Sequence, residues 1–393
     1  MIRELTPEEA ARAQELFAIA FEQPMERPVQ PDDGSLHRWA AFDDGTGEMM
    51  STLCVTDFDL NFDGSACKMG GIGGVATLPQ FRRRGGIREC FQAMLPDLYA
   101  KGYDFSYLYP FSTGYYRKFG YECCVQKYHA VVDLGLLAPP RTDGILRLAE
   151  SGNPMAEDIR AVDAAWEGRY NMMVRHREED YKWTREQDPA VKQAFTYVYF
   201  APDGTPGGYT TFTKEDQSDG RNLVCSRFFF TGREGFWGLM GLFKSLSSDH
   251  RLVKLTLPVQ AAMQYLMPEW SMGAVSWSVQ PAGMVRVVNV ENVLKKAAYI
   301  GSGGLTLQIH DPQIKENDRS FHLYFEEGRA TQVRDAWAEP DMVLSISAFS
   351  ALISGVCDFP RAAEWMDGVE VRRQADALPR VFYRKPLMIA DYF

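Results

Sequence analysis

The N-terminal part of the chain combines one helical pattern with several strand-like runs. Between Ala13 and Phe21, apolar residues recur at three- and four-residue spacing, which predicts an amphipathic helix. The segment 6–9, Thr-Pro-Glu-Glu, predicts where this helix begins, because it can form a capping box and places proline in the first turn. Apolar runs separated by glycine and aspartate follow and predict hairpin strands: His37–Phe42, Met49–Leu60 and Ala66–Thr77.

A second helix and a further strand come next. Apolar residues at helical spacing from Ile87 to Leu98 predict a helix that begins near Gly85, and Tyr103–Tyr109 is a predicted strand. Beyond residue 145, the order helix, hairpin, strand, helix, strand occurs again with little sequence identity. The predicted elements of this second unit are helices at 156–167, 178–188 and 235–247, and strands at 194–200, 207–214, 222–230 and 251–257.

A third unit begins near residue 284, with strands predicted at 304–310 and 320–326 and a helix at 346–354. We therefore predict an α/β (α+β) chain of three domains, with the boundaries 1–140, 141–283 and 284–393. The length of 393 residues agrees with this division, since a domain has roughly 150 residues.

Charge narrows the classes of partner. The chain has 52 acidic and 42 basic residues, a net charge of −10. Proteins that wrap a DNA or RNA duplex normally carry a basic excess, so we expect no nucleic-acid partner. An acidic surface favours cationic small molecules or basic peptides.

The cysteines and histidines exclude two further classes. The seven cysteines are irregularly spaced, without a CxxC motif, which is typical of reduced thiols in a cytoplasm rather than a disulfide scaffold. We interpret Cys123 and Cys124 as neighbours on opposite faces of a strand rather than as a redox pair. The six histidines are scattered, without HExxH or a Cys/His cluster, so we expect no catalytic metal.

The N-terminus has no signal-peptide pattern, and no run of about 18 apolar residues occurs. We therefore expect a cytoplasmic protein without a membrane partner.

Candidate chemistry gathers between residues 73 and 121. A predicted strand ends at Thr77, an arginine- and glycine-rich loop follows, and a helix begins near Gly85. A glycine-rich helix start offers free backbone N–H groups and the positive end of the helix dipole, so it can bind a pyrophosphate. The loop is not a P-loop, because no Lys-Ser/Thr follows, and it lacks the GxGxxG of dinucleotide folds. The alternative is a solvated surface loop.

This stretch resembles the acyl-CoA-binding core of the GNAT N-acetyltransferases. Their pattern is a strand followed by Arg/Gln-x-x-Gly-x-Gly/Ala at the start of a helix. The matching segment is Arg82-Arg83-Arg84-Gly85-Gly86-Ile87, where Ile87 departs from the small final residue. A Tyr-x-x-x-Gly-Phe/Tyr segment of the family also follows, as Tyr116-Arg117-Lys118-Phe119-Gly120-Tyr121.

Over nearly its full length, the chain resembles the Eis (enhanced intracellular survival) branch of that family. The resemblance implies tandem GNAT folds, the second degenerate and unable to hold CoA, followed by a sterol-carrier-protein-like α/β domain. It also implies an N-acetyltransferase that uses acetyl-CoA, without a metal, to acetylate a primary amine of an aminoglycoside, a polyamine or a lysine side chain. Hexamers are known in the family, so a homo-oligomer is implied.

The resemblance assigns site residues. Tyr116 falls at the position of the catalytic tyrosine, and a phenol with a pKa of about 10 stays protonated at pH 7 and can protonate the CoA thiolate. Tyr115 is the other candidate for this role. In the alternative without catalysis, both tyrosines only line the wall of a pocket. The backbone of Val75, Ala76 and Thr77 would contact the thioester, because this strand splays from its neighbour in GNAT folds and residues 70–74 permit a bulge.

No carboxylate of the motif is an obvious base. In Eis-type enzymes the terminal carboxylate reaches the active site, and here this group would belong to Phe393. By the same resemblance, Phe21, Trp39 and Met50 line the acceptor pocket, although such residues are more often part of a core. Two other functions compete: a lipid carrier that uses the C-terminal domain, and a non-catalytic assembly module that binds CoA.

Overall fold

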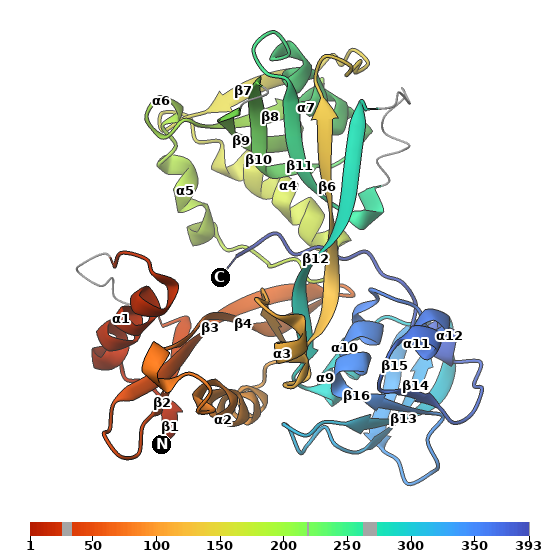
Figure 1. The fold of residues 1–393 in the computed structure, drawn as a ribbon. Helices are drawn as coiled ribbons and strands as arrows, with labels where there is room; N and C mark the ends of the chain where they lie inside the picture. Colours follow the sequence, from red (N-terminus) through yellow and green to blue (C-terminus); the bar gives the residue numbers. More distant parts are fainter. Residues whose placement is uncertain (26–33, 218–219, 262–272, 393) are drawn as a thin grey trace. The chain divides into compact units, whose positions relative to one another are not determined.

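The computed structural model describes residues 1–25, 34–217, 220–261 and 273–392, and it divides the chain into two compact units (Figure 1). The first unit is Met1–Val125, Ala282–Lys385 and Ala390–Phe393, and the second is Gln126–Pro281 and Pro386–Ile389. The chain passes from one unit to the other within the long strands β6 (Glu122–Asp133) and β12 (Val275–Val287), and again before and after the segment Pro386–Ile389. The predicted boundaries at residues 140 and 283 stay a prediction.

The N-terminal part of the first unit forms a mixed sheet with the strand order β1-β2-β3-β4-β5-β12. Neighbouring strands are antiparallel except β4 and β5, which are parallel and joined by the helix α2. The elements are β1 (Ile2–Glu4), η1 (Pro7–Glu9), α1 (Ala10–Phe21), β2 (Leu36–Phe42), β3 (Met49–Phe62), β4 (Ser65–Thr77), η2 (Pro79–Phe81), α2 (Gly86–Ala100), β5 (Phe105–Leu108) and α3 (Thr113–Arg117).

Most of these elements form where the hydrophobic pattern predicts them, whereas β1 and α3 were not predicted. The capping box is present at Thr6, whose backbone N–H donates to the Glu9 carboxylate at 3.1 Å, and a single 3-10 turn leads into α1. The buried face of α2 carries the apolar residues that predicted it: Ile87, Cys90, Phe91, Met94, Leu95 and Leu98.

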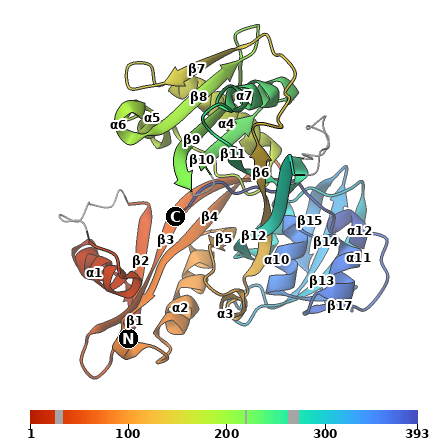
Figure 2. The same ribbon diagram turned by 45° about the horizontal axis from the view of Figure 1, so that its top comes forward.

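The helices α1 and α2 cover opposite faces of this sheet. Ala41 and Ser51 lie under Gly86 at the start of α2. Phe17 of α1 lies 3.7 Å from the position that a Cβ atom on Gly74 of β4 would take, next to Cys54. Because successive residues of a strand point to opposite faces, the odd-numbered residues of β3 near Ser51 face α2 and Cys54 faces α1. The separate positions of α1 and α2 are visible in Figure 2.

The C-terminal part of the first unit is a second α/β layer. Its five-stranded sheet has the order β15-β14-β13-β16-β17, in which β13 and β16 are parallel. The strongly apolar helix α10 is buried along most of its length. The elements are α9 (Val290–Lys296), β13 (Gly303–His310), β14 (Ser320–Glu326), β15 (Arg329–Asp335), β16 (Met342–Ser345), α10 (Ile346–Ser354), α11 (Phe359–Trp365), β17 (Val369–Val371) and α12 (Leu378–Val381).

The second unit repeats the strand order of the first. Its sheet runs β7-β8-β9-β10-β11-β6, and its parallel pair, β10 and β11, is joined by α7 as β4 and β5 are joined by α2. The structural repeat predicted from the element order is therefore present. Its elements are β7 (Ile145–Ala149), α4 (Ala156–Arg169), η3 (Glu178–Tyr181), α5 (Lys182–Arg185), α6 (Pro189–Lys192), β8 (Ala194–Phe200), β9 (Pro206–Gln217), β10 (Gly220–Phe230), α7 (Arg233–Ser245), β11 (Leu252–Pro258) and η4 (Val259–Ala261).

One predicted helix of this unit is wrong. Residues 178–188 form a 3-10 turn and the four-residue helix α5 instead of one continuous helix. The segment is polar around most of its circumference, so it lacks the continuous apolar face that stabilises a longer helix. Asp188 then caps a new short helix by accepting the N–H groups of Ala190 and Val191.

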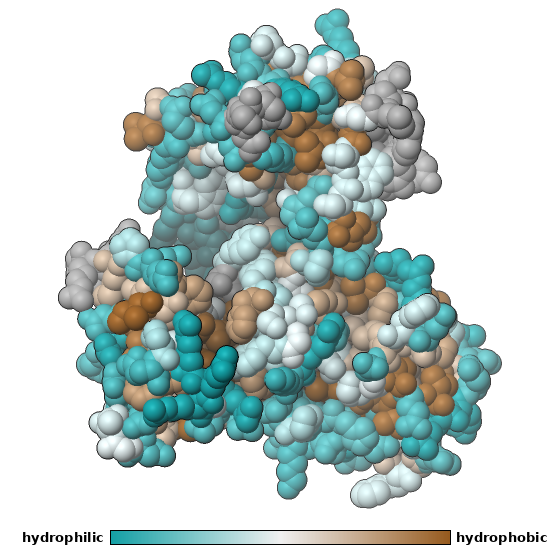
Figure 3. All heavy atoms as spheres, viewed as in Figure 1, coloured by the Kyte–Doolittle hydropathy of each residue, from teal (hydrophilic) through white to brown (hydrophobic). Residues whose placement is uncertain are grey.

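The surface is mainly polar on the face drawn in Figure 3, where apolar residues form small separate groups. Across the residues described, no helix combines the length and the hydropathy needed to cross a lipid bilayer. All seven cysteines are free thiols, and Cys123 and Cys124 are successive residues of β6, as interpreted from the sequence.

Candidate active site

A bulge interrupts strand β4 near its C-terminal end. Thr52 of β3 is opposite Ala76, whereas Cys54 is opposite Gly73, so β4 contains one residue more than β3 between these pairs. Gly74 has a φ of 58° there, a conformation that glycine adopts without a steric cost. The bulge that the glycine run predicted is therefore present.

Past the bulge, β4 separates from β5. The parallel pairing of the two strands ends at Ile72 and Leu108. Ala76 and Thr77 still pair with β3 on one side, and Val75 lies within the bulge. On the β5 side, the described strands offer these three residues no partner. Backbone groups on this edge are free of the sheet and can bind a ligand, since an unpaired peptide group needs a hydrogen-bond partner.

The N-terminus of α2 lies at the same end of β4. Gly85 has a φ of 93° and precedes the helix, and no side chain caps the first turn. A Cβ atom on Gly86 would lie 2.5 Å from Ser51 Oγ, so glycine permits this close approach. Ser51 is opposite Thr77, and their hydroxyl oxygens are 2.9 Å apart. The open start of α2 therefore lies over β2 and β3, close to Thr77 at the C-terminal end of β4, and free N–H groups at a helix start can bind an anion.

The arginines before α2 are exposed and the residue after the glycines is buried. Arg83 has a positive φ of 68°. Arg84 lies over the Phe81 ring at 5.2 Å and 3.4 Å from the Asp43 carboxylate. Together with Arg82, these side chains are on the surface, where they can reach a phosphate. The side chain of Ile87 packs into the core, and this accounts for an apolar residue where the motif has a small one.

The equivalent helix of the second unit, α7, also begins after a glycine without a side-chain cap. Glu234 lies in its first turn, and its carboxylate accepts a hydrogen bond from the Tyr199 hydroxyl at 3.1 Å. Helix α2 likewise has an acidic residue, Glu89, in its first turn, so this feature does not distinguish the two helices. The prediction that the second unit does not hold CoA stays untested.

Tyr116 lies on α3, behind α2. Its side chain is 2 % exposed, and its ring makes edge-on contacts with Phe91, Phe111, Tyr115 and Tyr121. Burial raises the pKa of the Tyr116 phenol well above its ordinary value. The group therefore stays protonated throughout the neutral range and can act as a proton donor.

Tyr115, the alternative donor, is less buried. Its ring is 5.4 Å from Phe111 and 5.5 Å from Phe119, and burial also raises its pKa. Phe111 is 74 % exposed and touches both tyrosines, so it lies at the outer side of this aromatic group.

The chain returns to this region near residue 392. The Tyr109 hydroxyl donates a hydrogen bond of 2.5 Å to the backbone oxygen of Asp391, and the Tyr109 and Tyr392 rings stack at 4.4 Å. Tyr109 directly follows β5, where β5 separates from β4. Phe393 itself lies outside the described residues.

A pocket of about 440 Å³ opens between α1 and the sheet and reaches the bulge of β4. Its described lining is mainly apolar or uncharged and includes one cation: Ala13, Gln14, Phe17, Ala18, Gln23, Pro24, Met25, Leu36, Arg38, Thr52, Cys54, Thr56, Gly73 and Gly74. The bulge thus separates this pocket from the start of α2 on the other face of the sheet.

The three residues predicted for the acceptor site are not part of this lining. Phe21 is exposed at the end of α1 and stacks on Phe17, which does line the pocket. Trp39 and Met50 belong to the hydrophobic core, the alternative that the sequence left open. Along β2, Trp39 and Ala41 point away from Arg38, toward α2.

The sequence contained a signal for the actual lining. In β3, the polar or small residues Thr52, Cys54 and Thr56 alternate with buried apolar ones. This alternation marks the strand face that is not filled by the core, and all three residues line the pocket. Among the described residues, no group of three or more His, Cys, Asp and Glu side chains is arranged to hold a metal ion.

Comparisons with known proteins place this geometry in a family. The family model of the acetyltransferase (GNAT) domain matches residues 1–124, and that of the sterol carrier protein domain matches residues 290–388. A search of curated proteins gave no match.

Several solved structures share the fold over the whole chain. A conserved protein from Enterococcus faecalis V583, named as a probable N-acyltransferase, has a TM-score of 0.84 at 21 % identity, covering 100 % of this chain and 99 % of its own. A GCN5-related N-acetyltransferase from Anabaena variabilis has 0.84 at 17 % identity and covers 100 % of both chains. Eis1 from Mycobacterium abscessus has 0.80 at 20 % identity and also covers 100 % of both.

The matched domain contains the open α2 terminus, the bulged β4 and Tyr116. The predicted fold class is confirmed, and so is the prediction of an acyltransferase. The chain therefore contains an acetyltransferase (GNAT) domain over residues 1–124 and a sterol carrier protein domain over residues 290–388, and it shares its overall fold with solved structures that include Eis1 from Mycobacterium abscessus.

Proposed function

We propose that the protein transfers the acetyl group of acetyl-CoA to a primary amine. The observation that carries this proposal is the bulge of β4, which adjoins the open end of α2 and the acceptor pocket at one point of the sheet. A pyrophosphate at the start of α2 would direct pantetheine along the free edge of Val75–Thr77. An amine in the pocket would then meet the thioester at the bulge.

The reaction follows from these groups. The amine nitrogen attacks the thioester carbonyl, so a C–N bond forms and negative charge develops on the oxygen. Backbone N–H groups of Val75–Thr77 can donate to this oxyanion. The C–S bond then breaks, Tyr116 donates its proton to the leaving thiolate, and the nitrogen loses a proton to a base.

The terminal carboxylate of Phe393 is the base and cation anchor in this proposal. Support comes from the docking of Asp391 and Tyr392 on Tyr109, beside the point where β4 and β5 separate. No carboxylate is among the described residues that line the pocket, so the lining leaves this role open. An ionised α-carboxylate can attract an ammonium and accept its proton through water, although its ordinary pKa of about 3.5 requires help from the free amine fraction.

Extending the chain by one glycine after Phe393 is expected to lower kcat at least tenfold, with little effect on the acetyl-CoA KM. The added residue displaces the carboxylate by about 3.5 Å, beyond hydrogen-bond reach of an amine that it formerly contacted. Steady-state thiol release measures both constants. A variant with Phe393→Leu, which keeps the carboxylate in place, is the control, and full kcat in the extended enzyme contradicts the assignment.

The acceptor class in this proposal is a polyamine, an aminoglycoside or a lysine side chain. The net charge of −10 favours the approach of such cations. The described lining of the pocket is mainly apolar or uncharged, and removal from water favours the neutral, nucleophilic form of an amine. The pocket therefore suits the reacting amine, while further ammonium groups of the acceptor would remain outside the lining.

Ala18→Trp is expected to raise the KM for the amine about tenfold or more and to leave the CoA dissociation constant within twofold. The indole would fill part of the pocket beside Phe17, on the opposite face of the sheet from the start of α2. Ile19→Trp is the matched control, because Ile19 is the next residue of α1 and is 52 % exposed. Equal effects of the two substitutions would show that the pocket is not the acceptor site.

A further inference from the structure

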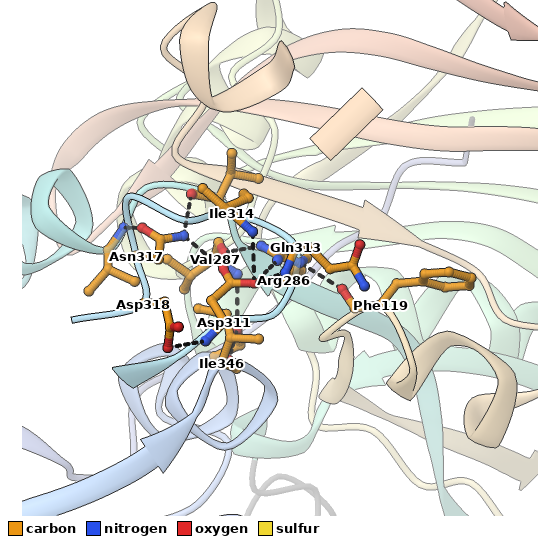
Figure 4. Close-up of polar contacts among 12 residues, drawn as sticks. Phe119, Arg286, Val287, Asp311, Gln313, Ile314, Asn317, Asp318 and Ile346 are labelled. Carbon is orange, nitrogen blue, oxygen red and sulfur yellow. Dashed lines mark hydrogen bonds and ion pairs between the residues drawn. The ribbon is translucent and has the colours of Figure 1, made fainter. Parts of the chain in front are cut away.

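A fully buried ion pair lies behind the segment that carries Tyr116. Arg286 of β12 and Asp311 are both inaccessible to solvent, and Arg286 Nη2 donates to Asp311 Oδ1 at 2.6 Å (Figure 4). Removing an arginine from water is costly, so such a pair persists only where its geometry and hydrogen bonds are well satisfied.

Other groups satisfy most of the remaining hydrogen-bond donors and acceptors of Arg286 and Asp311. Asp311 Oδ1 also accepts the N–H groups of Gln313 and Ile314, at 3.0 and 3.2 Å, and Oδ2 accepts Asn317 Nδ2 at 2.9 Å. Arg286 Nη1 donates to the backbone oxygen of Val287 at 2.9 Å. The loop of the sterol carrier protein domain that contains Asp311 therefore fixes the plane of the guanidinium group.

The third nitrogen of Arg286 is directed at the Tyr116 segment. Arg286 Nε donates to the backbone oxygen of Phe119 at 2.7 Å. Phe119 in turn donates its N–H to the backbone oxygen of Tyr116 at 2.9 Å, and its ring stacks on that of Phe91 of α2 at 4.3 Å. Gly120 closes the turn with a φ of 84°. One hydrogen bond thus links the ion pair to the turn that holds Tyr116 and, through the stacked ring, to α2.

The turn is also confined sterically. A Cβ atom on Gly120 would lie 2.6 Å from Ile346 Cγ2 and 3.0 Å from Arg286 Nε. Ser350, on the same helix as Ile346, accepts the N–H of Val287 at 2.9 Å. Residues from β12, α10 and the Asp311 loop therefore surround the turn after α3, and a short five-residue helix gains its position from them.

We propose that Arg286, oriented by Asp311, is a positioning residue for Tyr116, and that the sterol carrier protein domain serves in catalysis by holding this arginine. The proposal rests on the proposed role of Tyr116 as the acid. Proton donation requires the hydroxyl within hydrogen-bond reach of the sulfur, and a displacement of about 1 Å lowers the rate severalfold to a hundredfold.

The test is a double-mutant cycle of Arg286→Lys and Tyr116→Phe. The substrates are acetyl-CoA and one amine, chosen as the fastest-reacting member of a panel that contains a polyamine, an aminoglycoside and a lysine peptide. A lysine keeps the charge but cannot donate to both Phe119 and Asp311 in the same geometry. Arg286→Lys is expected to lower kcat about tenfold and to change the acetyl-CoA KM by less than twofold. In the Tyr116→Phe background it is expected to cause no further loss, because the acid that it positions is absent.

A purely structural role gives a different result. The two losses then multiply in the double variant, or Arg286→Lys leaves kcat unchanged, and either result overturns the positioning proposal while the acid role of Tyr116 stands. Full activity of Tyr116→Phe alone overturns both. If Arg286→Lys does not fold, Asn317→Ala, which removes one donor to Asp311, decides through the same cycle with an expected loss of about threefold.

A second buried pair provides the matched control. Lys385 Nζ donates to the Asp63 carboxylate at 2.5 Å, with both side chains less than 10 % exposed, and joins the turn between β3 and β4 to the C-terminal domain. Lys385→Met breaks a buried pair in the same unit but touches neither α3 nor the turn after it. It is expected to lower the melting temperature and to retain kcat within twofold at temperatures below unfolding. Loss of kcat equal to that of Arg286→Lys would overturn the specific link to Tyr116.

Discussion

Tyr116→Phe is expected to lower kcat about 100-fold or more and to leave the KM for acetyl-CoA nearly unchanged. The substitution removes one proton donor but keeps the ring that packs against Phe91 and Tyr121, so the fold and the binding of CoA are retained. A loss of this size is usual when a general acid is removed. Steady-state thiol release over a range of acetyl-CoA concentrations measures both constants.

The pH profile gives an independent test of the same role. A phenol ordinarily has a pKa of about 10, and burial raises that of Tyr116 further. The protonated phenol is the active form, so a raised pKa extends the active pH range to higher pH. Deprotonation of Tyr116 should therefore not lower kcat of the native enzyme at any pH below about 10. Tyr115→Phe is the control. If kcat of Tyr115→Phe falls by about 100-fold, while kcat of Tyr116→Phe stays normal, the acid is Tyr115.

Gly85→Pro is expected to raise the CoA dissociation constant about 10- to 100-fold. Proline fixes φ near −65°, whereas Gly85 has a φ of 93°, so the loop must rearrange and the first N–H groups of α2 lose their common direction. Hydrogen bonds to a charged group contribute about 1.5–3 kcal/mol each, which corresponds to this range for one bond. Isothermal titration with CoA is the measurement.

Gly85→Asn is the matched control for this substitution. Asparagine tolerates the left-handed conformation better than other residues with a side chain, so the loop should keep its shape and the dissociation constant should stay within about threefold. Arg84→Ala should weaken binding only modestly, because the side chain is exposed and the backbone supplies most contacts. An unchanged dissociation constant in Gly85→Pro, with the variant folded, means that the phosphate does not bind at α2.

The sequence predicted most elements of the fold because their signals are local. The capping box before α1, the apolar stripe of α2 and the glycine run of β4 each lie within a few residues of the structure that they specify. The predicted helix at 178–188 was wrong, because the composition of this segment gives no continuous apolar face. Local pattern also predicted the repeat in the second unit, through the order of its elements.

The lining of the pocket between α1 and the sheet was harder to predict. In β3 the alternation of Thr52, Cys54 and Thr56 with apolar residues separates two strand faces, but the sequence does not show which helix covers each face. Trp39 and Arg38 are neighbours that point in opposite directions, and only the pairing of the sheet with both helices assigns Arg38 to the pocket. The identity of the lining therefore depended on packing.

The ion pair behind Tyr116 could not be predicted from the sequence at all. Phe119, Arg286 and Asp311 are separated by 167 and 25 positions along the chain, and no periodicity links them. Strand β12 brings Arg286 opposite Ser106 of β5, which places its side chain beside the turn after α3. Contacts of this kind arise from the topology of the fold rather than from local sequence.

The most direct test of the central claim is amine-dependent release of CoA thiol, followed by mass spectrometry of the amine. The protein is mixed with acetyl-CoA and, separately, with a polyamine, an aminoglycoside and a lysine-containing peptide. The account predicts thiol release that requires one of these amines. The mass of the amine should increase by about 42 Da, the replacement of one hydrogen by an acetyl group, with about one acetylation for each thiol released. Binding of CoA without thiol release from any of the three amines would contradict the account, because the open end of α2 would then serve only to bind the nucleotide.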